Sequence, residues 1–288
     1  MLSKVKPATG KLLISEPFLN DPNFRRSVVL MAEHSEEGTL GFILNQPSLL
    51  LLKDLIPDNF TDIHSHLIPG IDDGAKTMDD SIQLISELEN IGFNQFITTP
   101  HVLPFVWNNT KQTILGGEST VLEILKSKKE KVEFKAAAEY MLDSSLFEKM
   151  ENEKLLTLKD DYLLIEMSYL NPPIQLLEYI YRIQVEGYQP ILAHPERYLF
   201  YHKSFDKYES LKKAGCLFQM NLLSTVGYYG NHVAEISNKL LKKGLIDFVG
   251  SDVHHQKHVE AFKGRLLIKE MAPLKEAIHN NRLFRFSV

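Results

Sequence analysis

The sequence predicts an α/β protein in which a parallel β/α barrel follows a short β-rich N-terminal segment. Three observations predict it: seven short apolar runs recur from Phe60 onward, six of the intervals between them have helix-like patterns, and most runs end in His, Asp or Glu. Near-continuous apolar strands that alternate with helices are typical of a parallel sheet covered by helices. Seven repeats predict a distorted (β/α)7 barrel, an irregular relative of the eight-stranded one.

Residues 1–59 have a different pattern from the rest of the chain. Polar breaks with turn chemistry, such as Glu36-Glu37-Gly38, separate three strand-like runs. The runs span residues 10–17, 27–34 and 38–46. We place the boundary at Pro57-Asp58-Asn59, which predicts a β-rich segment over 1–59 and a barrel over 60–288.

The barrel region begins with a strand and then alternates strand and helix. Its apolar runs span 61–66, 93–101, 133–140, 162–169, 189–197, 217–224 and 247–255. Thr77 and Asp80 form a capping-box pattern that starts a helix, and Gly92 stands where that helix would stop. Pro172-Pro173 is predicted to open a second helix that ends at Gly187, and Gly244 closes a third that contains Val233 and Leu240.

Side chains that can bind metals mark the C-terminal ends of the predicted strands. In a parallel barrel these ends open onto one face, where active sites lie. His64 and His66 are two residues apart on an extended strand, so their side chains point to the same face. We predict nine candidate ligands: His64, His66, Asp73, His101, Glu139, Glu166, His194, Asp252 and His254.

The chemistry of this set predicts the kind of metal site. Imidazoles and carboxylates without thiolates suit Mn, Fe or Zn, and the thiolate pattern of structural zinc is absent. Nine ligands exceed the needs of one tetrahedral ion and suit two or three ions. Ions roughly 3.5–4 Å apart can share a hydroxide and clamp a phosphoryl group.

Arg197 is the candidate phosphate contact, because a guanidinium donates two parallel hydrogen bonds to phosphate oxygens. The alternative is a structural salt bridge, with Glu196 as one possible partner. Cys216 lacks an Arg six positions later and a glycine-rich loop, so we expect it to be buried and inert. Trp107 and Tyr228-Tyr229 lie in loops after strands. They either form a wall for an aromatic substrate or pack on the barrel, and we favour packing.

Composition excludes several functions. Lys and Arg total 32 against 37 Asp and Glu, for a net charge of -5, which argues against a general binder of nucleic acid. The sequence has no run of 18 apolar residues, so we predict no membrane span. The first residues lack the apolar region of a signal peptide. A single cysteine allows no intrachain disulfide. We therefore expect a cytoplasmic protein.

Residues 60–288 resemble the PHP superfamily, and within it the CpsB/YwqE-like bacterial protein-tyrosine phosphatases. The resemblance rests on TDIHSHLIPGIDDGAKT, ITTPH, AAAEY, LLIE, LAHPERY, MNLLS and GSDVHH, in that order. It implies a distorted barrel with three metal ions, commonly manganese. It also implies that the substrate is phosphotyrosine on a protein, such as a tyrosine autokinase that controls capsule and exopolysaccharide export.

The same resemblance implies how the ligands divide. His64, His66, Glu139 and Asp252 would hold the first ion; Glu139, Glu166 and His194 the second; and Asp73, His101 and His254 the third. Some family members carry a second phosphate-binding Arg after the last metal-binding His. This chain has Lys257 in that region, and Lys is a point charge rather than a bidentate donor.

The first 57 residues resemble the beginning of another family, the AlgH/YqgE-like proteins, through GKLLISEPFLNDPNFRRSVVLMAEHSEEGTLGFILNQPS. Members of that family are far longer than this stretch. A shortened β-segment exposes unpaired strand edges, which must pack on the barrel, pair with another copy or stay partly disordered.

The function predicted from the sequence is hydrolysis of phosphotyrosine by a metal-bridging hydroxide. Arg197 would stabilise charge on the phosphoryl oxygens, and Asp252 or His254 would relay a proton. One alternative is a phosphoesterase of the same kind for a small molecule such as histidinol phosphate. The alternative from another class is a non-catalytic interaction protein that binds its partner through the N-terminal segment. The oligomeric state is left open.

Overall fold

The computed structural model describes residues 7–16, 19, 21, 24, 26–44, 50–128 and 131–286. The chain divides into two compact units, Met1–Leu49 and Leu50–Val288. This division falls earlier than the boundary predicted near Pro57. The reason is that the leucine run enters a short 3-10 helix, Leu52–Leu55, in which Leu52 is fully buried in the hydrophobic core of the second unit. The Leu52 N–H also donates to the Gly264 carbonyl at 3.0 Å.

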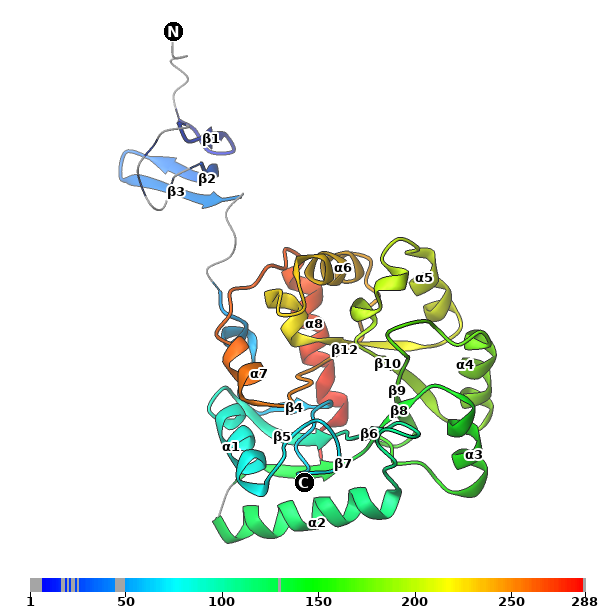
Figure 1. The fold of residues 1–288 in the computed structure, drawn as a ribbon. Coiled ribbons are helices and arrows are strands. Elements are labelled where there is room, and N and C mark those ends of the chain that lie inside the picture. The colour runs from blue at the N-terminus through cyan, green and yellow to red at the C-terminus, as the bar shows by residue number, and fades with distance from the viewer. Residues whose placement is uncertain are drawn as a thin grey trace. The chain divides into compact units, whose positions relative to one another are not determined.

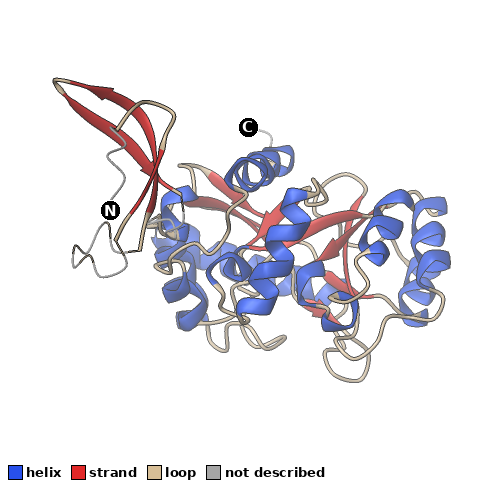
Figure 2. Cartoon of the chain, turned by 90° about the horizontal axis from the view of Figure 1, so that it is seen from above, coloured by secondary structure: helices blue, strands red, loops and turns tan. Residues whose placement is uncertain are grey.

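The first unit contains a three-stranded antiparallel sheet (Figures 1 and 2). Its strands are β1 (Leu12–Ile14), β2 (Val28–Ser35) and β3 (Gly38–Ile43), in that spatial order. They overlap the three runs predicted to be strands, and β2 extends one residue beyond its run, to Ser35. A tight turn at residues 36–37 joins β2 to β3, and a register shift between Met31 and Glu33 interrupts their pairing.

The second unit contains a parallel sheet that curls into a distorted barrel. Its strands are β4 (Phe60–Asp62), β5 (Phe93–Thr98), β6 (His101–Val102), β7 (Glu133–Ala136), β8 (Glu139–Met141), β9 (Tyr162–Glu166), β10 (Gln189–Ala193), β11 (Leu217–Asn221) and β12 (Phe248–Gly250). Each predicted run overlaps at least one strand, and two runs are divided between pairs of strands, β5/β6 and β7/β8. Pairing follows β4-β5-β7 and β12-β11-β10-β9-β8-β6, and a parallel bridge joins Ser65 to Val253. The predicted α/β barrel is confirmed.

Helices cover the outside of this sheet (Figure 1), and Figure 2 shows the strands between them. One helix fills each of the six predicted intervals, and two more follow β12. They are α1 (Met78–Glu89), α2 (Lys111–Lys128), α3 (Ser144–Asn152), α4 (Leu176–Val185), α5 (Asp206–Lys213), α6 (Asn231–Lys242), α7 (Gln256–Ala261) and α8 (Met271–Asn280). No helix in the described ranges has the length and apolar character that crossing a bilayer requires.

Local sequence accounts for where the helices begin. The predicted capping box at α1 is present: Asp80 N–H donates to Thr77 Oγ1 at 3.2 Å, and Thr77 N–H donates to Asp80 Oδ2 at 3.0 Å. Helix α4 begins at Leu176, later than the predicted start at Pro172-Pro173. A residue that precedes a proline is disfavoured in the helical region, so Pro172 cannot start the helix.

The barrel interior below the strand ends is apolar. Residues from successive strands meet there, and Phe284 from the C-terminal 3-10 helix packs among them. This inner cluster contains Ile63, Ile97, Ala137, Leu158, Leu164, Ile191, Ala193, Phe248 and Phe284. The strand residues on the other face pack under the helices in a larger core. A close-packed interior of this kind holds the strand ends, and the polar side chains on them, in defined positions.

Two buried polar contacts close the barrel between its first and last strands. Asn281 is 1% exposed; its Nδ2 donates to Thr61 O at 2.9 Å and to Val249 O at 2.8 Å, and its Oδ1 accepts from Val249 N–H at 3.1 Å. Asp62 accepts from the backbone N–H of Ser251 at 2.9 Å and from its hydroxyl at 2.6 Å. Burial raises the pKa of Asp62 to about 6. These contacts tie β4 to β12 directly beneath the candidate ligands.

Replacing Asn281 by Ala is expected to lower the free energy of unfolding by about 3 kcal/mol, because it leaves buried backbone groups of Thr61 and Val249 without partners. Urea unfolding followed by circular dichroism measures the change. Asn152→Ala, at the exposed end of α3, is the matched control and is expected to stay within about 0.5 kcal/mol of the parent. Equal effects of the two substitutions would contradict the closing role of Asn281.

Candidate metal centre

All nine predicted ligands meet at the C-terminal end of the barrel strands. They form four overlapping groups in which one potential ligand atom from each residue lies within 4.8 Å of the others. The groups are His66, Asp73, His101 and His254; His64, His194 and Asp252; His64, His66 and Glu139; and His101, Glu139 and Glu166. Since the groups share members, the nine residues make one continuous cluster, which we call the metal-site cluster.

The centre of the cluster is formed by His64 and His66 facing two carboxylates. The Nε2 atoms of the two histidines are 3.4 Å apart. Asp252 Oδ1 lies 3.3 Å from the first and 3.4 Å from the second, and Glu139 Oε2 lies 3.3 Å from His64 Nε2. These ligand atoms therefore face a common point, as the period of an extended strand predicts for His64 and His66.

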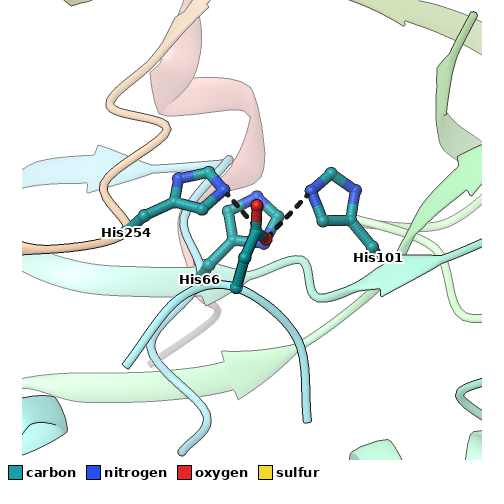
Figure 3. A group of neighbouring side chains, drawn as sticks. His66, His101 and His254 are labelled. Atoms are coloured by element: carbon teal, nitrogen blue, oxygen red, sulfur yellow. Dashed lines mark ion pairs between the residues drawn. The ribbon is translucent and has the colours of Figure 1, made fainter. Parts of the chain in front are cut away.

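The outer part of the cluster is formed around His101 (Figure 3). His101 Nδ1 lies 3.0 Å from Glu139 Oε2 and 2.8 Å from Glu166 Oε1, so it contacts both carboxylates. Asp73 Oδ1 lies 3.5 Å from His101 Nε2 and 3.5 Å from His254 Nε2. Figure 3 shows His66, His101 and His254 turned toward one another, although they follow different strands.

His194 contacts more than one part of the cluster. Its Nε2 lies 3.0 Å from Glu139 Oε1, and it also groups with His64 and Asp252. Burial lowers the pKa of His194 to about 4, so the ring is neutral, which is the form that binds metals. Both His194 and Asp252 have positive φ angles, 36° and 50°, which are uncommon for residues other than glycine and concentrate at functional sites.

The donor set fits divalent cations. Glu139, Glu166 and Asp252 are all buried, and burial together with the Glu139 charge raises the pKa of Glu166. Glu139 Oε2 and His194 Nδ1 are buried without a hydrogen-bond partner among the described residues. Buried carboxylates that repel one another, one of them with an oxygen that has no hydrogen-bond partner, are stabilised by bound cations. Oxygen and imidazole nitrogen without thiolate suit Mn, Fe or Zn.

Residues that the sequence analysis did not identify as functional orient the ligands. Asp72 Oδ2 lies 2.7 Å from His66 Nδ1, and Gln219 Oε1 lies 2.7 Å from His64 Nδ1. Such contacts fix the ring orientation and leave Nε2 for a metal. The sequence contains a pattern that points to Gln219. Gln219 and Asn221 are two residues apart on β11, so their side chains point to the same face of the strand, as those of His64 and His66 do after β4. Neither side chain is a typical metal ligand, so the pattern was overlooked.

Glycines allow these orienting residues to approach closely. A side chain on Gly74 would place its Cβ 2.2 Å from His66 O, in the turn that carries Asp72 and Asp73. A Cβ on Gly250 would lie 2.6 Å from the Cβ of His64 and 2.5 Å from Gln219 Nε2. Both positions therefore need glycine for close approach of the backbone rather than for a positive φ.

Arg197 lies beside the cluster and pairs with Asp252. Its Nη1 donates to Asp252 Oδ2 at 2.6 Å, so the predicted alternative partner, Glu196, is not its partner. Asn221 Nδ2 donates to the same Oδ2 at 2.8 Å and to the hydroxyl of Tyr229 at 3.0 Å. The guanidinium carbon lies 4.2 Å from the Tyr229 ring centroid, so Tyr229 supports Arg197 in addition to packing.

Lys257 and Cys216, which the sequence analysis also considered, differ in their exposure to solvent. Lys257 is exposed on α7 and lines a cavity of about 720 Å³ together with Asp73 and His254. Cys216 is fully buried, and burial raises its pKa to about 12, as expected for an inert thiol. The chemistry at the strand ends therefore does not involve the cysteine.

Fold and cluster together define a parallel β/α barrel protein with a candidate multinuclear metal centre. The model of the family described as "Capsular polysaccharide synthesis, CpsB/CapC" matches residues 60–261. The chain belongs to the CpsB/CapC family. The tyrosine-protein phosphatase YwqE of Bacillus subtilis is 28% identical over 197 residues, which cover 68% of this chain and 78% of that protein.

A solved structure and a second relative extend the comparison. The structure described as YwqE from Bacillus subtilis and CpsB from Streptococcus pneumoniae, "unique metal-dependent tyrosine phosphatases", aligns with a TM-score of 0.69 and 25% identity. The alignment covers 78% of this chain and 93% of that one. UPF0301 protein BF2109 of Bacteroides fragilis is 54% identical over 56 residues, 19% of this chain and 29% of that protein. The resemblance of the N-terminal segment to part of a longer protein is thus confirmed.

Replacing Asp72 by Ala is expected to weaken divalent-metal binding about 10- to 100-fold, because His66 loses the carboxylate that orients its ring. Calorimetric titration of the metal-free protein with Mn²⁺ measures the affinity. Asp79→Ala is the matched control, since Asp79 is exposed in the first turn of α1, and it is expected to bind like the parent. Unchanged affinity in Asp72→Ala would contradict the orienting role.

Proposed function

We propose that this protein is a metal-dependent tyrosine-protein phosphatase that hydrolyses phosphotyrosine on a protein substrate. The observation that carries the proposal is the continuous cluster of nine imidazole and carboxylate ligands with Arg197 at its side. Phosphoryl transfer depends mainly on positioning and on charge stabilisation, and this arrangement supplies groups for both. Membership of the CpsB/CapC family and the similarity to YwqE support the choice of phosphotyrosine.

We assign the ligands to three ions, with manganese as the proposed metal and Fe or Zn as other candidates. His64, His66, Glu139 and Asp252 would hold the first ion; Glu139, Glu166 and His194 the second; and Asp73, His101 and His254 the third. Divalent ions in such a site lower the pKa of water and neutralise charge on phosphoryl oxygens. Glu139 belongs to two of the groups, which fits a carboxylate with both oxygens directed into the cluster.

The chain's own residues have three tasks in this reaction. Arg197 binds the phosphoryl oxygens with the guanidinium nitrogens that do not contact Asp252, and Lys257 adds positive charge nearby. Asp252 and His254 are the proposed proton donors to the leaving oxygen. Asp252 is the weaker candidate, because Arg197 and Asn221 both donate to its Oδ2 and its Oδ1 faces the histidines. A phenol has a pKa of about 10, so its oxygen needs little protonation to leave.

The proposed partner is a bacterial tyrosine autokinase that takes part in capsule or exopolysaccharide synthesis. The family's description as capsular polysaccharide synthesis supports this partner. The N-terminal β-segment is not assigned a part in the chemistry, since every proposed catalytic and metal-binding residue lies in the second unit. The non-catalytic alternative assigns partner binding to the N-terminal segment, residues 1–57, instead.

Removal of metals with a chelator is expected to abolish hydrolysis of p-nitrophenyl phosphate and of a phosphotyrosyl peptide, and Mn²⁺ is expected to restore it. His194→Ala and Asp252→Ala are expected to lower kcat/KM at least about 100-fold, because each removes a proposed ligand. Cys216→Ala is the control and is expected to stay within about twofold of the parent, since the thiol is buried and protonated.

Each alternative to the proposed function predicts a different experimental result. Full activity in Asp252→Ala would overturn the site assignment. Metal binding without hydrolysis, and partner binding lost on deleting residues 1–49, would favour the non-catalytic protein. Faster turnover of histidinol phosphate than of the peptide would favour the small-molecule phosphoesterase.

Replacing Arg197 by Lys is expected to lower kcat/KM for aryl phosphates about 10- to 100-fold, because Lys keeps the charge but loses the planar fork. The inhibition constant of inorganic phosphate is expected to rise in parallel. Arg182→Lys, in which the original Arg stacks on Phe147 away from the cluster, is the control. An unchanged phosphate inhibition constant would show that Arg197 does not bind the phosphoryl group.

A further inference from the structure

A second cavity begins at the metal-site cluster and extends away from it. Its volume is about 870 Å³, and Asp73, His101 and Glu166 of the cluster form part of its lining. This volume is typical of a pocket for an organic ligand and exceeds what a single phenol ring fills. A molecule whose phosphoryl group lies at the cluster can therefore place the rest of its structure in this cavity.

The walls of this cavity are largely apolar. Leu103 and Trp107 come from the loop after β6, Met141 from β8, and Leu170 and Ile174 from the loop after β9. Leu170 and Ile174 are 82% and 98% exposed and both line the cavity, so exposed apolar surface is gathered there. No Lys or Arg is among the described residues that line the cavity, whereas Asp73, Asp143 and Glu166 are.

Tyr169 lies where the cavity meets the phosphate-binding group. Its ring is stacked on the His194 ring with centroids 5.8 Å apart and an interplanar angle of 21°. The guanidinium carbon of Arg197 lies 5.0 Å from the Tyr169 centroid. The side chain nevertheless remains 46% exposed and lines the cavity. Tyr169 therefore contacts a proposed metal ligand, the proposed phosphate ligand and the apolar cavity at once.

We propose that this cavity binds the phenyl ring of the phosphotyrosine together with a neighbouring apolar residue, and that Tyr169 determines specificity for aryl over alkyl phosphates. The inference rests on the proposed phosphatase function and names its substrate class more closely. Aromatic rings attract each other beyond their buried area, so a phenyl ester gains a contact that an alkyl ester lacks. An acidic residue beside the phosphotyrosine is disfavoured, because the wall outside the metal-site cluster is largely apolar and its charged residue there is Asp143, a carboxylate.

The cavity on the other side of Asp73 is the competing location for the substrate. It has a volume of about 720 Å³ and is lined by Lys76 and Lys257 as well as by Trp107. Its cations would favour acidic residues next to the phosphotyrosine, which is the opposite of the preference expected for the apolar cavity. The two locations therefore predict different peptide specificities.

Binding of two phosphonates to the Mn²⁺-loaded full-length protein tests the inference without turnover. Phenylphosphonate and methylphosphonate share the anionic group and differ in the ring, and neither can be hydrolysed. Calorimetry is expected to show at least about tenfold tighter binding of phenylphosphonate, because the ring is buried in the apolar cavity. Trp107 is the one tryptophan of the chain and lines both cavities, so a change in its fluorescence with phenylphosphonate alone reports binding of the ring, and the Tyr169 substitution decides which cavity holds it.

Substitution of Tyr169 identifies the residue responsible. Tyr169→Leu is expected to weaken phenylphosphonate binding about three- to tenfold and methylphosphonate binding less than twofold, and Tyr169→Phe is expected to resemble the parent. Tyr181→Leu is the matched control, since Tyr181 is 67% exposed on α4 and does not line the cavity. Equal loss for both phosphonates would show that Tyr169 only positions Arg197 and would overturn its role in specificity.

Peptide turnover gives an independent readout. The parent is expected to hydrolyse a phosphotyrosyl peptide with Leu beside the phosphotyrosine at least about fivefold faster, in kcat/KM, than the same peptide with Glu there. The reverse preference, or equal affinity for the two phosphonates, would overturn the cavity assignment while leaving the phosphatase function intact. Absence of metal-dependent hydrolysis of p-nitrophenyl phosphate would instead overturn the proposed function itself.

Discussion

The crowding of buried carboxylates and imidazoles at one end of the barrel is the constraint on which the rest of the structure depends. Glu139, Glu166 and Asp252 are held together away from water, where like charges repel strongly. Burial opposes ionisation, but the neighbouring histidines hold the pKa of Glu139 and of Asp252 well below the usual range, whereas the pKa of Glu166 is raised by burial and by the Glu139 charge. Glu139 Oε2 and His194 Nδ1 have no hydrogen-bond partner among the described residues, which marks room for a cation. The cluster is therefore built for cations.

The barrel supplies the rigidity that holds such a cluster together. Asn281, Asp62 and Ser251 tie the first strand to the last by hydrogen bonds that are buried and complete. At the C-terminal ends of β10 and β12, His194 and Asp252 have positive φ angles, and there the chain leaves the strands and enters the metal-site cluster. Uncommon backbone conformations persist only where the surrounding packing determines them, and here that packing is the barrel core.

The residues around Arg197 connect the metal-site cluster to the cavity proposed to bind the substrate. Tyr169 and Tyr229 both contact the guanidinium, while Asn221 joins Tyr229 to Asp252. Arg197 thus contacts the metal-site cluster through Asp252 and the apolar cavity through Tyr169. Under the proposed function, the same network contacts both the phosphoryl group and the leaving group.

The alternation of strands and helices, the metal-capable residues at most strand ends and the capping box at Thr77 are local patterns, so the sequence by itself determined the barrel and the candidate ligands. The unit boundary could not be predicted in this way, because Leu52 joins the second unit through a core built from residues distant in the chain and through a backbone hydrogen bond to Gly264. The roles of Asp72, Gln219, Asn221 and Tyr169 were decided only by the tertiary structure. Each acts through a side chain from another part of the fold, and no periodicity encodes which strand ends meet.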